Sequence, residues 1–177
     1  MPTLTIPDPA LVVLVGAAGS GKSTLARRRF APDEILSSDA LRAAVSGDEA
    51  DQRASRTAFT ILHRELARRL AAGRLTVVDA TNLRAEHRRP LRGAARDAGV
   101  PAVAIVLDLP TGTVHARNAG RTRVVDAEVV ARQLSWLRQT VDGERLDAEG
   151  FDPIVILRTT DEVDHLEIVR VPLSRPG

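Results

Sequence analysis

The stretch LVVLVGAAGSGKST, residues 11–24, decides the fold. Its first five residues form a continuous apolar run that is typical of a buried parallel strand. The glycine-rich part matches the pattern G-x-x-x-x-G-K-[ST], and the residues after it have helical character. Strand, glycine loop and helix are the context that this pattern requires. We therefore interpret residues 16–24 as a phosphate-binding loop (P-loop) and not as a Gly-rich surface turn.

Lysine occurs only at position 22, although the chain has 25 lysine and arginine residues. In a P-loop, backbone N–H groups converge on phosphate oxygens, and the helix N-terminus adds the positive end of its dipole. The compact ammonium of Lys22 fits between two phosphates, where a planar guanidinium would crowd the same space. We expect ATP or another nucleoside triphosphate to be bound by Gly16, Gly19, Ser20, Gly21, Lys22, Ser23 and Thr24.

The composition predicts a single α/β domain over residues 1–177. Cysteine is absent, which excludes a disulfide framework, a cysteine zinc site and a thiol nucleophile, and is typical of a reducing cytoplasm. No apolar stretch approaches the roughly 20 residues that span a bilayer, and the first ten residues lack a signal-peptide pattern. We expect a soluble cytoplasmic protein that does not associate with a membrane.

The charges are unevenly distributed although the net charge is only +2. Residues 51–96 hold 11 arginines and four carboxylates, a local net charge of +7. Residues 124–177 hold 11 carboxylates and six arginines. This pattern indicates a basic side that a phosphate-rich partner would meet, and an acidic side.

Apolar strands alternate with helices along the chain. Further strands are expected at residues 34–38, 75–80, 102–109 and 154–158, and helices at about 22–30, from 38 or 39, 50–72, 84–98, 112–120 and 126–141. We expect residues 165–171 beside the last strand, residues 1–10 as a lead-in, and Pro90 either at a kink or in the first turn of its helix. The alternation predicts a mainly parallel sheet with helices on both faces, as in P-loop kinases.

The segment SSDALR carries a candidate general base. Asp39 follows the second strand, and Arg42 lies one helical turn further on the same face. A carboxylate near the terminal phosphate can accept the proton of an attacking hydroxyl, and Arg42 can hold an anionic group of the acceptor. The alternative is that Asp39 caps a helix, and one carboxylate can do both.

The segment VVDATN carries a candidate metal ligand. Asp79 ends an apolar strand, in the position of a carboxylate that would hold a Mg²⁺ water, and Ser23 is the P-loop ligand. Asp108 competes for this role. We favour Asp79 because Thr81 and Asn82, candidate substrate-binding residues, lie at the same strand end, where open α/β sheets bind ligands.

The segment HARNAGRTR places Arg117, Arg121 and Arg123 on a helix end and a Gly-containing turn. Arginines on a mobile lid, here about residues 117–125, can close over the triphosphate and neutralise the charge that develops during transfer. The alternative is a solvated arginine face.

Together these motifs resemble a known group of proteins. The segments GAAGSGKST, SSDALR, VSGDEADQ, LTVVDATN and RNAGR are similar to the 5′-hydroxyl polynucleotide kinase domain of the bacterial polynucleotide kinase-phosphatase RNA repair family. The resemblance covers about Leu11 to Val141. It implies a P-loop kinase fold, ATP and Mg²⁺ as cofactors, a nucleic acid 5′ end as acceptor, and association with phosphatase or ligase modules.

The resemblance also implies roles for individual residues. Lys22 and Ser23 would serve the phosphates and Mg²⁺. Asp39 would be the general base for the 5′-hydroxyl, and Arg42 would hold the phosphate next to the attacked nucleoside.

The resemblance makes Arg117 and Arg121 lid arginines that contact ATP. The segment RTRVVD, which contains Arg123, is shorter than the lid of the family and lacks its proline.

The basic helix expected at residues 84–98 has two interpretations, and only one of them indicates a polyanionic acceptor. Four arginines at i, i+4 spacing make one stripe along which a polyanion could lie: Arg84, Arg88, Arg92 and Arg96. Arg89 lies beside this stripe. The alternative is an ordinary amphipathic helix, with a solvated arginine side and Leu91, Ala94, Ala95 and Ala98 on the buried face.

Aromatic side chains are scarce, which argues against recognition by base stacking. They are Phe30, Phe59, Phe151 and Trp136, and we expect most of them in the core. Phe59 shares its helical spacing with Leu62, Leu66 and Leu70. Contacts to a nucleic acid would then be mainly to phosphate.

Three hypotheses for the function follow. The first is an ATP-dependent 5′-hydroxyl polynucleotide kinase. The second is a small-molecule kinase of the same fold that acts on a nucleoside, sugar or antibiotic hydroxyl. The third is a regulatory module that binds ATP without transferring phosphate to an acceptor. The sequence does not indicate the oligomeric state, the base of the donor, or whether RNA or DNA is preferred.

Overall fold

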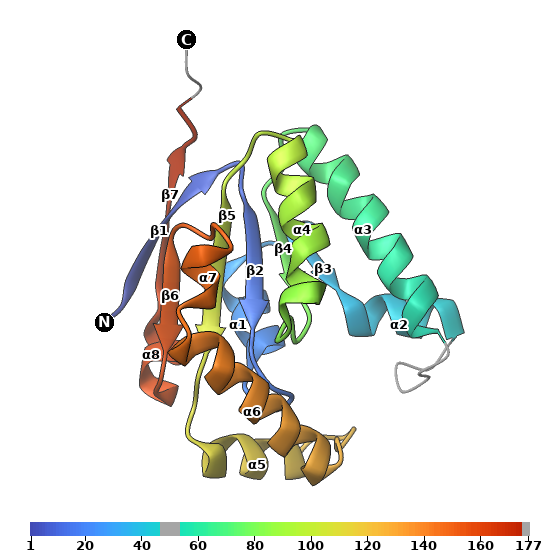
Figure 1. Ribbon diagram of the computed structural model, residues 1–177, viewed down its shortest axis with the longest axis vertical. Helices are drawn as coiled ribbons and strands as arrows, with labels where there is room; N and C mark the ends of the chain where they lie inside the picture. Colours follow the sequence, from blue (N-terminus) through green and yellow to red (C-terminus); the bar gives the residue numbers. More distant parts are fainter. Residues whose placement is uncertain (47–53, 175–177) are drawn as a thin grey trace.

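The computed structural model describes residues 1–46 and 54–174 (Figure 1). Its main sheet consists of five parallel strands in the order β3-β4-β2-β5-β6. The strands are β2 (Leu11–Val15), β3 (Ile35–Ser37), β4 (Thr76–Asp79), β5 (Ala102–Leu107) and β6 (Ile154–Leu157). The predicted α/β fold with a mainly parallel sheet is therefore confirmed.

Helices cover both faces of this sheet (Figure 1). They are α1 (Lys22–Arg29), α2 (Ser38–Ser46), α3 (Ser55–Ala71), α4 (Ala85–Asp97), α5 (Thr111–Ala119), α6 (Ala127–Asp142), α7 (Arg145–Ala148) and α8 (Thr160–His165), with a short 3₁₀ turn at Pro32–Glu34. No helix within residues 1–46 and 54–174 is long and apolar enough to cross a membrane.

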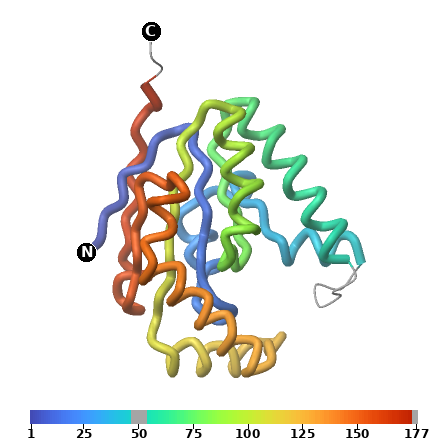
Figure 2. The backbone as a smooth tube through the Cα atoms, viewed as in Figure 1, coloured from blue at the N-terminus to red at the C-terminus, as the bar shows by residue number. Residues whose placement is uncertain are grey.

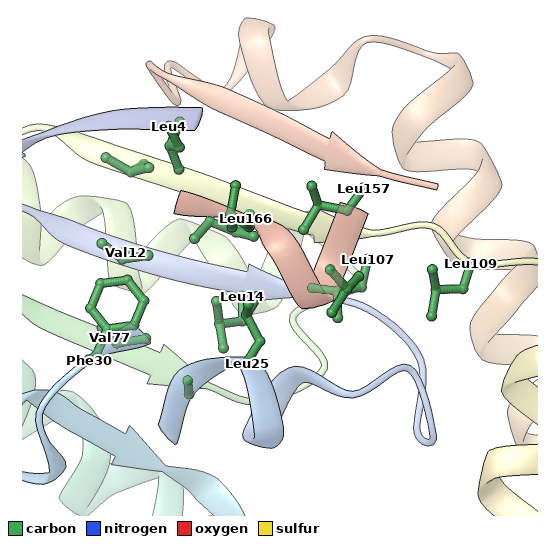
Figure 3. Close-up of a cluster of buried hydrophobic side chains, with 14 of the residues drawn as sticks. Leu4, Val12, Leu14, Leu25, Phe30, Val77, Leu107, Leu109, Leu157 and Leu166 are labelled. Carbon is green, nitrogen blue, oxygen red and sulfur yellow. The ribbon is translucent and has the colours of Figure 1, made fainter. Parts of the chain in front are cut away.

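Strand β2 divides the core into two layers because its successive side chains point to opposite faces of the sheet. Val12 and Leu14 pack with α1, α8 and the N-terminal residues, as Figure 3 shows. Leu11, Val13 and Val15 pack with α3, α4 and α7 on the other face. All five residues are fully buried, which explains why the strand is a continuous apolar run.

The two ends of the chain correct the prediction for residues 1–10 and 165–171. Strand β1 (Thr3–Asp8) pairs in parallel with β7 (Glu167–Pro172), and the two form a separate sheet. The course of both ends of the chain can be followed in Figure 2. Leu4 and Ile6 alternate with polar residues and enter the core, so the N-terminal segment is a strand and not a lead-in. Helix α8 intervenes between β6 and β7 and redirects the chain away from the edge of the main sheet.

Two local predictions concern helices. Pro90 lies inside α4, beyond its first turn, so the first-turn alternative was wrong. The expected start of the long helix at residue 50 lies outside the described residues, as do residues 47–52 of the VSGDEADQ motif and Arg53.

Candidate active site

A cleft of about 1270 Å³ lies beside the carboxyl ends of β3 and β4 and the P-loop that follows β2. Helix α8 borders it at one end and helices α2 and α3 at the other, with α1 between them (Figure 1). The cleft brings together most of the predicted site residues: Gly19, Gly21, Lys22, Ser23, Thr24, Asp39, Arg42, Asp79, Thr81, Arg117, Arg121 and Arg123.

The P-loop glycines are required by close packing. A Cβ atom on Gly16 would lie 2.7 Å from Ser20 Oγ, and one on Gly19 would lie 2.8 Å from the carbonyl oxygen of Val114. Gly19 and Gly21 also have φ of +84° and +99°, which L side chains rarely adopt. Because Val114 belongs to α5, Gly19 packs the P-loop directly against the helix that begins the lid.

Lys22 is buried at the centre of the cleft. Its Nζ donates hydrogen bonds to the carbonyl oxygen of Ala17 at 2.9 Å and to Ser20 Oγ at 3.4 Å. Burial lowers the pKa of Lys22 from 10.5 to about 8; the carboxylate of Asp79 opposes this shift and the charge of Arg121 adds to it. The ammonium is thus held in a place where additional negative charge would stabilise it.

Asp79 and Ser23 form the best candidate metal site. Ser23 Oγ donates a 2.6 Å hydrogen bond to Asp79 Oδ2, and Asp79 is only 6% exposed. A hydroxyl and a carboxylate oxygen suit Mg²⁺, which takes one or two protein ligands and completes its shell with water and phosphate oxygens. Asp108 is instead 3.7 Å from Arg158 and is not among the described residues that line the cleft. This geometry favours Asp79.

Asp39 lies at the α2 end of the cleft as part of a charged group. Arg42 Nη2 donates to Asp39 Oδ1, and Arg123 Nη1 is 3.8 Å from the same oxygen. The helix cap is a different residue, because Ser37 Oγ accepts the hydrogen bond of the Ala40 N–H. Asp39 is therefore free of the capping role considered above, and its side chain remains 38% exposed towards the cleft.

The three predicted lid arginines all line the cleft. Arg117 donates to the carbonyl oxygen of Ser20 and to Thr160 Oγ1, each at 3.4 Å, and so contacts the P-loop and α8. Arg121 and Arg123 lie in the loop between α5 and α6. Arg117 and Arg123 are partly buried and Arg121 is exposed, so the role of these arginines as a lid stays a prediction.

Asn118 and Gln133 are two site residues that the sequence analysis missed. Asn118 is buried and closes the lid loop through two hydrogen bonds with the backbone of Val125, at 2.7 and 3.0 Å. Gln133 of α6 lines the cleft and accepts the N–H of Ala18 in the P-loop at 2.8 Å. Asn118 precedes Gly120 within the segment RNAGR, which is a local signal for the first, but no local signal marks the second.

Of the predicted substrate-binding residues at the end of β4, only Thr81 lines the cleft. Asn82 is buried with φ +50°, and its amide donates to the carbonyl oxygens of Leu14 and Ala80. Asn82 thus secures the turn after β4 against β2.

The arginine stripe predicted on α4 as a path for a polyanion is interrupted. Arg88 is fully buried, is paired with Glu149 through two hydrogen bonds of 2.8 and 2.5 Å, and donates to the carbonyl oxygen of Asn82. Arg92 stacks over the ring of Phe151. The stripe alternative fails at Arg88, which faces Glu149 after α7, while Arg84 and Arg96 at the two ends of the stripe are exposed.

Comparison with known proteins agrees with this fold. A sequence profile described as an AAA domain matches residues 11–142. The chain belongs to this family. No curated protein matches the sequence.

Solved structures with the same fold include several kinases. A sugar kinase from Janibacter sp. HTCC2649 is 20% identical with a TM-score of 0.58, over 88% of this chain and 90% of that one. The Pnkp1/Rnl/Hen1 RNA repair complex contains a chain with 21% identity and a TM-score of 0.61, over 77% of this chain and 46% of that one. The AvrRxo1-ORF1:ORF2 complex with ATP is 14% identical with a TM-score of 0.66, over 88% and 56%.

These likenesses establish the fold of a P-loop kinase. The match with this AAA domain covers less than half of the repair-complex chain and most of the sugar kinase. The likenesses show the fold alone, and the reaction and its acceptor are left to be inferred from the cleft.

Proposed function

We propose that this AAA domain is an ATP-dependent 5′-hydroxyl polynucleotide kinase of the cytoplasm. The observation that carries the proposal is the pairing of Asp39 with Arg42 at one end of a cleft whose centre is Lys22. A carboxylate and a guanidinium side by side suit an acceptor that presents a hydroxyl and, one linkage away, a phosphate. The 5′-terminal nucleotide of a strand has this arrangement.

In this reaction Asp39 accepts the proton of the 5′-hydroxyl while its oxygen attacks the γ-phosphorus. The bond between that phosphorus and the β–γ bridging oxygen breaks, and the leaving ADP carries the electron pair. Lys22 and the lid arginines Arg117, Arg121 and Arg123 neutralise charge on the phosphates. Ser23 and Asp79 would hold Mg²⁺, which supplies further charge neutralisation when bound.

The protein is expected to contact few phosphates of the acceptor strand. Because Arg88 is buried, α4 offers no continuous basic path, and Arg42 is the arginine that is placed to hold a phosphate beside Asp39. Affinity for the strand should fall with rising salt concentration, with a shallow slope that corresponds to few phosphate contacts. Association with phosphatase or ligase modules is part of the proposal by analogy with the repair complex.

The test uses γ-labelled ATP, Mg²⁺ and matched RNA and DNA oligonucleotides that carry either a 5′-hydroxyl or a 5′-phosphate. We expect label only on 5′-hydroxyl strands. Lys22→Ala and Asp39→Asn should abolish transfer, and Asp39→Asn should retain ATP binding. Asp97→Asn is the matched control, because Asp97 is 80% exposed on α4 and lies outside the cleft. Near-normal transfer by Asp39→Asn would remove Asp39 as the base.

A small-molecule kinase is the second candidate, and the interruption of the arginine stripe favours it. It would act on a nucleoside, sugar or antibiotic hydroxyl, and Arg42 would hold an anionic group of that molecule. ATP binding without label on any oligonucleotide, followed by transfer to a hydroxyl metabolite, would replace the polynucleotide proposal with this one.

A further inference from the structure

Phe59 lies in the cleft and not in a hydrophobic core. It shares its helical spacing with Leu62, Leu66 and Leu70, which are at most 1% exposed. Phe59 itself is only half-buried, and within the described residues it belongs to neither core cluster. It lines the cleft instead, unlike Phe30 and Phe151, which are buried.

The position of Phe59 is at the acceptor end. Helix α3 packs against α2 (Figure 1). The residues of α2 that line the cleft are Ser38, Asp39, Ala40, Arg42 and Ala43. An acceptor whose hydroxyl reaches Asp39 and whose phosphate reaches Arg42 would have its remaining atoms in the part of the cleft that α2 and α3 line. The large apolar surface that α3 contributes there is the ring of Phe59.

His63 supports this ring from the next turn of α3. The two ring centroids are 6.3 Å apart and the ring planes are tilted by 47°. Such an aromatic pair fixes the orientation of a partly exposed ring. Burial also lowers the pKa of His63, which favours the neutral form of its ring.

We infer that Phe59 is the surface on which the base of the acceptor's 5′-terminal nucleotide stacks. This inference rests on the proposed function and adds a nucleobase to the chemistry of the acceptor. Stacking of one base on an aromatic side chain improves affinity by roughly 5- to 150-fold, and any base can stack because every base has a π-face. The kinase would then select nucleotide acceptors over sugars without preferring a particular base.

The experiment combines a substitution in the protein with the removal of one base from the acceptor. Phe59→Leu keeps an apolar side chain but removes the aromatic face, and Phe59→Trp restores an aromatic face. Each protein is given a 5′-hydroxyl oligonucleotide with a normal first nucleotide, and the same strand with an abasic first nucleotide. The KM values for ATP and for the acceptor are measured separately, and an unchanged KM for ATP shows that the fold is intact.

We expect Phe59→Leu to raise the KM for the normal acceptor at least about tenfold, and Phe59→Trp to stay near the native value. The abasic acceptor should be poor for the native protein and no poorer for Phe59→Leu. An equal loss with both acceptors, or no loss with either, would overturn the inference while leaving the kinase proposal in place. If the native protein labels no 5′-hydroxyl strand at all, the proposed function and this inference fail together.

Discussion

Arg121 and Arg88 both come from arginine-rich segments, yet Arg121 lines the cleft and Arg88 is buried against Glu149. Arg121 follows the end of α5, on a loop that Asn118 closes through two hydrogen bonds with the backbone of Val125. Arg88 lies within α4, on the face that α4 turns towards the interior. The role of an arginine in this chain therefore depends on the element that presents it, and the local density of arginines does not reveal that role.

The two settings have different physical consequences. In the cleft, burial lowers the pKa of Lys22, the carboxylate of Asp79 opposes this shift and the charge of Arg121 adds to it, so additional negative charge would stabilise the ammonium. At Arg88, the carboxylate of Glu149 and the carbonyl oxygen of Asn82 satisfy the guanidinium. The first arrangement is suited to attract phosphates, and the second holds the chain after α7 against α4.

The largest effect should come from Arg121→Ala. Loss of a lid arginine removes charge stabilisation of the transferring phosphoryl group, and we expect the kcat for transfer to fall by about 10³-fold. The free energy of unfolding should change little, because the side chain of Arg121 is exposed. Initial rates with labelled ATP and urea-induced unfolding measure both quantities. Arg96→Ala is the matched control, since the side chain of Arg96 is 83% exposed and α4 carries it away from the cleft.

A fall of less than about tenfold in kcat for Arg121→Ala would assign Arg121 to the solvated face of the lid. Arg121 would then have no catalytic role to contrast with the structural role of Arg88.

The contrast also shows which features the sequence could predict. The strand β2, the P-loop and α1 were predicted because the pattern G-x-x-x-x-G-K-[ST] is local and has only one structural context. Ser23 and Asp79, both predicted as metal ligands, are joined by a 2.6 Å hydrogen bond, because parallel strands place the loop after β2 and the end of β4 at one edge of the sheet. Their binding of a metal stays a prediction.

The missed features depend on distant residues. Gln133 reaches the P-loop across a sequence separation of 115 residues, and Glu149 meets Arg88 across a separation of 61. The helical spacing of Phe59 matched that of the core leucines of α3, but the Phe59 side chain lines the cleft. Periodicity indicates which face of a helix is apolar. It does not indicate which residues of that face the core covers and which residues line a cleft.

A smaller effect, on stability and not on catalysis, is expected for Arg88→Met. The substitution leaves Glu149 as a largely buried carboxylate without its partner, and we expect the free energy of unfolding to fall by about 3 kcal/mol. Urea-induced unfolding measures this change, with Arg96→Met as the control that should change by less than about 0.5 kcal/mol. Adding Glu149→Leu to Arg88→Met should restore part of the loss. A loss of less than about 1 kcal/mol would show that the buried ion pair does not stabilise this face of α4.

The smallest of the three effects concerns the pH dependence of nucleotide binding at Lys22. The pKa of Lys22 in the folded protein, about 8, lies below its ordinary value of 10.5. The buried ammonium therefore destabilises the folded protein at every pH below about 8, and this cost disappears as the pH rises from about 8 towards 10.5. Phosphates bound beside Lys22 would stabilise its charged form and raise its pKa.

Binding of ATP above about pH 8 should therefore be coupled to uptake of a proton, and the affinity should fall by about tenfold between about pH 7.5 and about pH 9.5. Calorimetric titrations near pH 8.5, in two buffers with different ionisation enthalpies, measure the proton uptake directly. Lys22→Met should bind more weakly and show neither the uptake nor the fall in affinity. If the native affinity is constant across this range, Lys22 keeps an ordinary pKa, and burial does not set its ammonium apart from the paired guanidinium of Arg88.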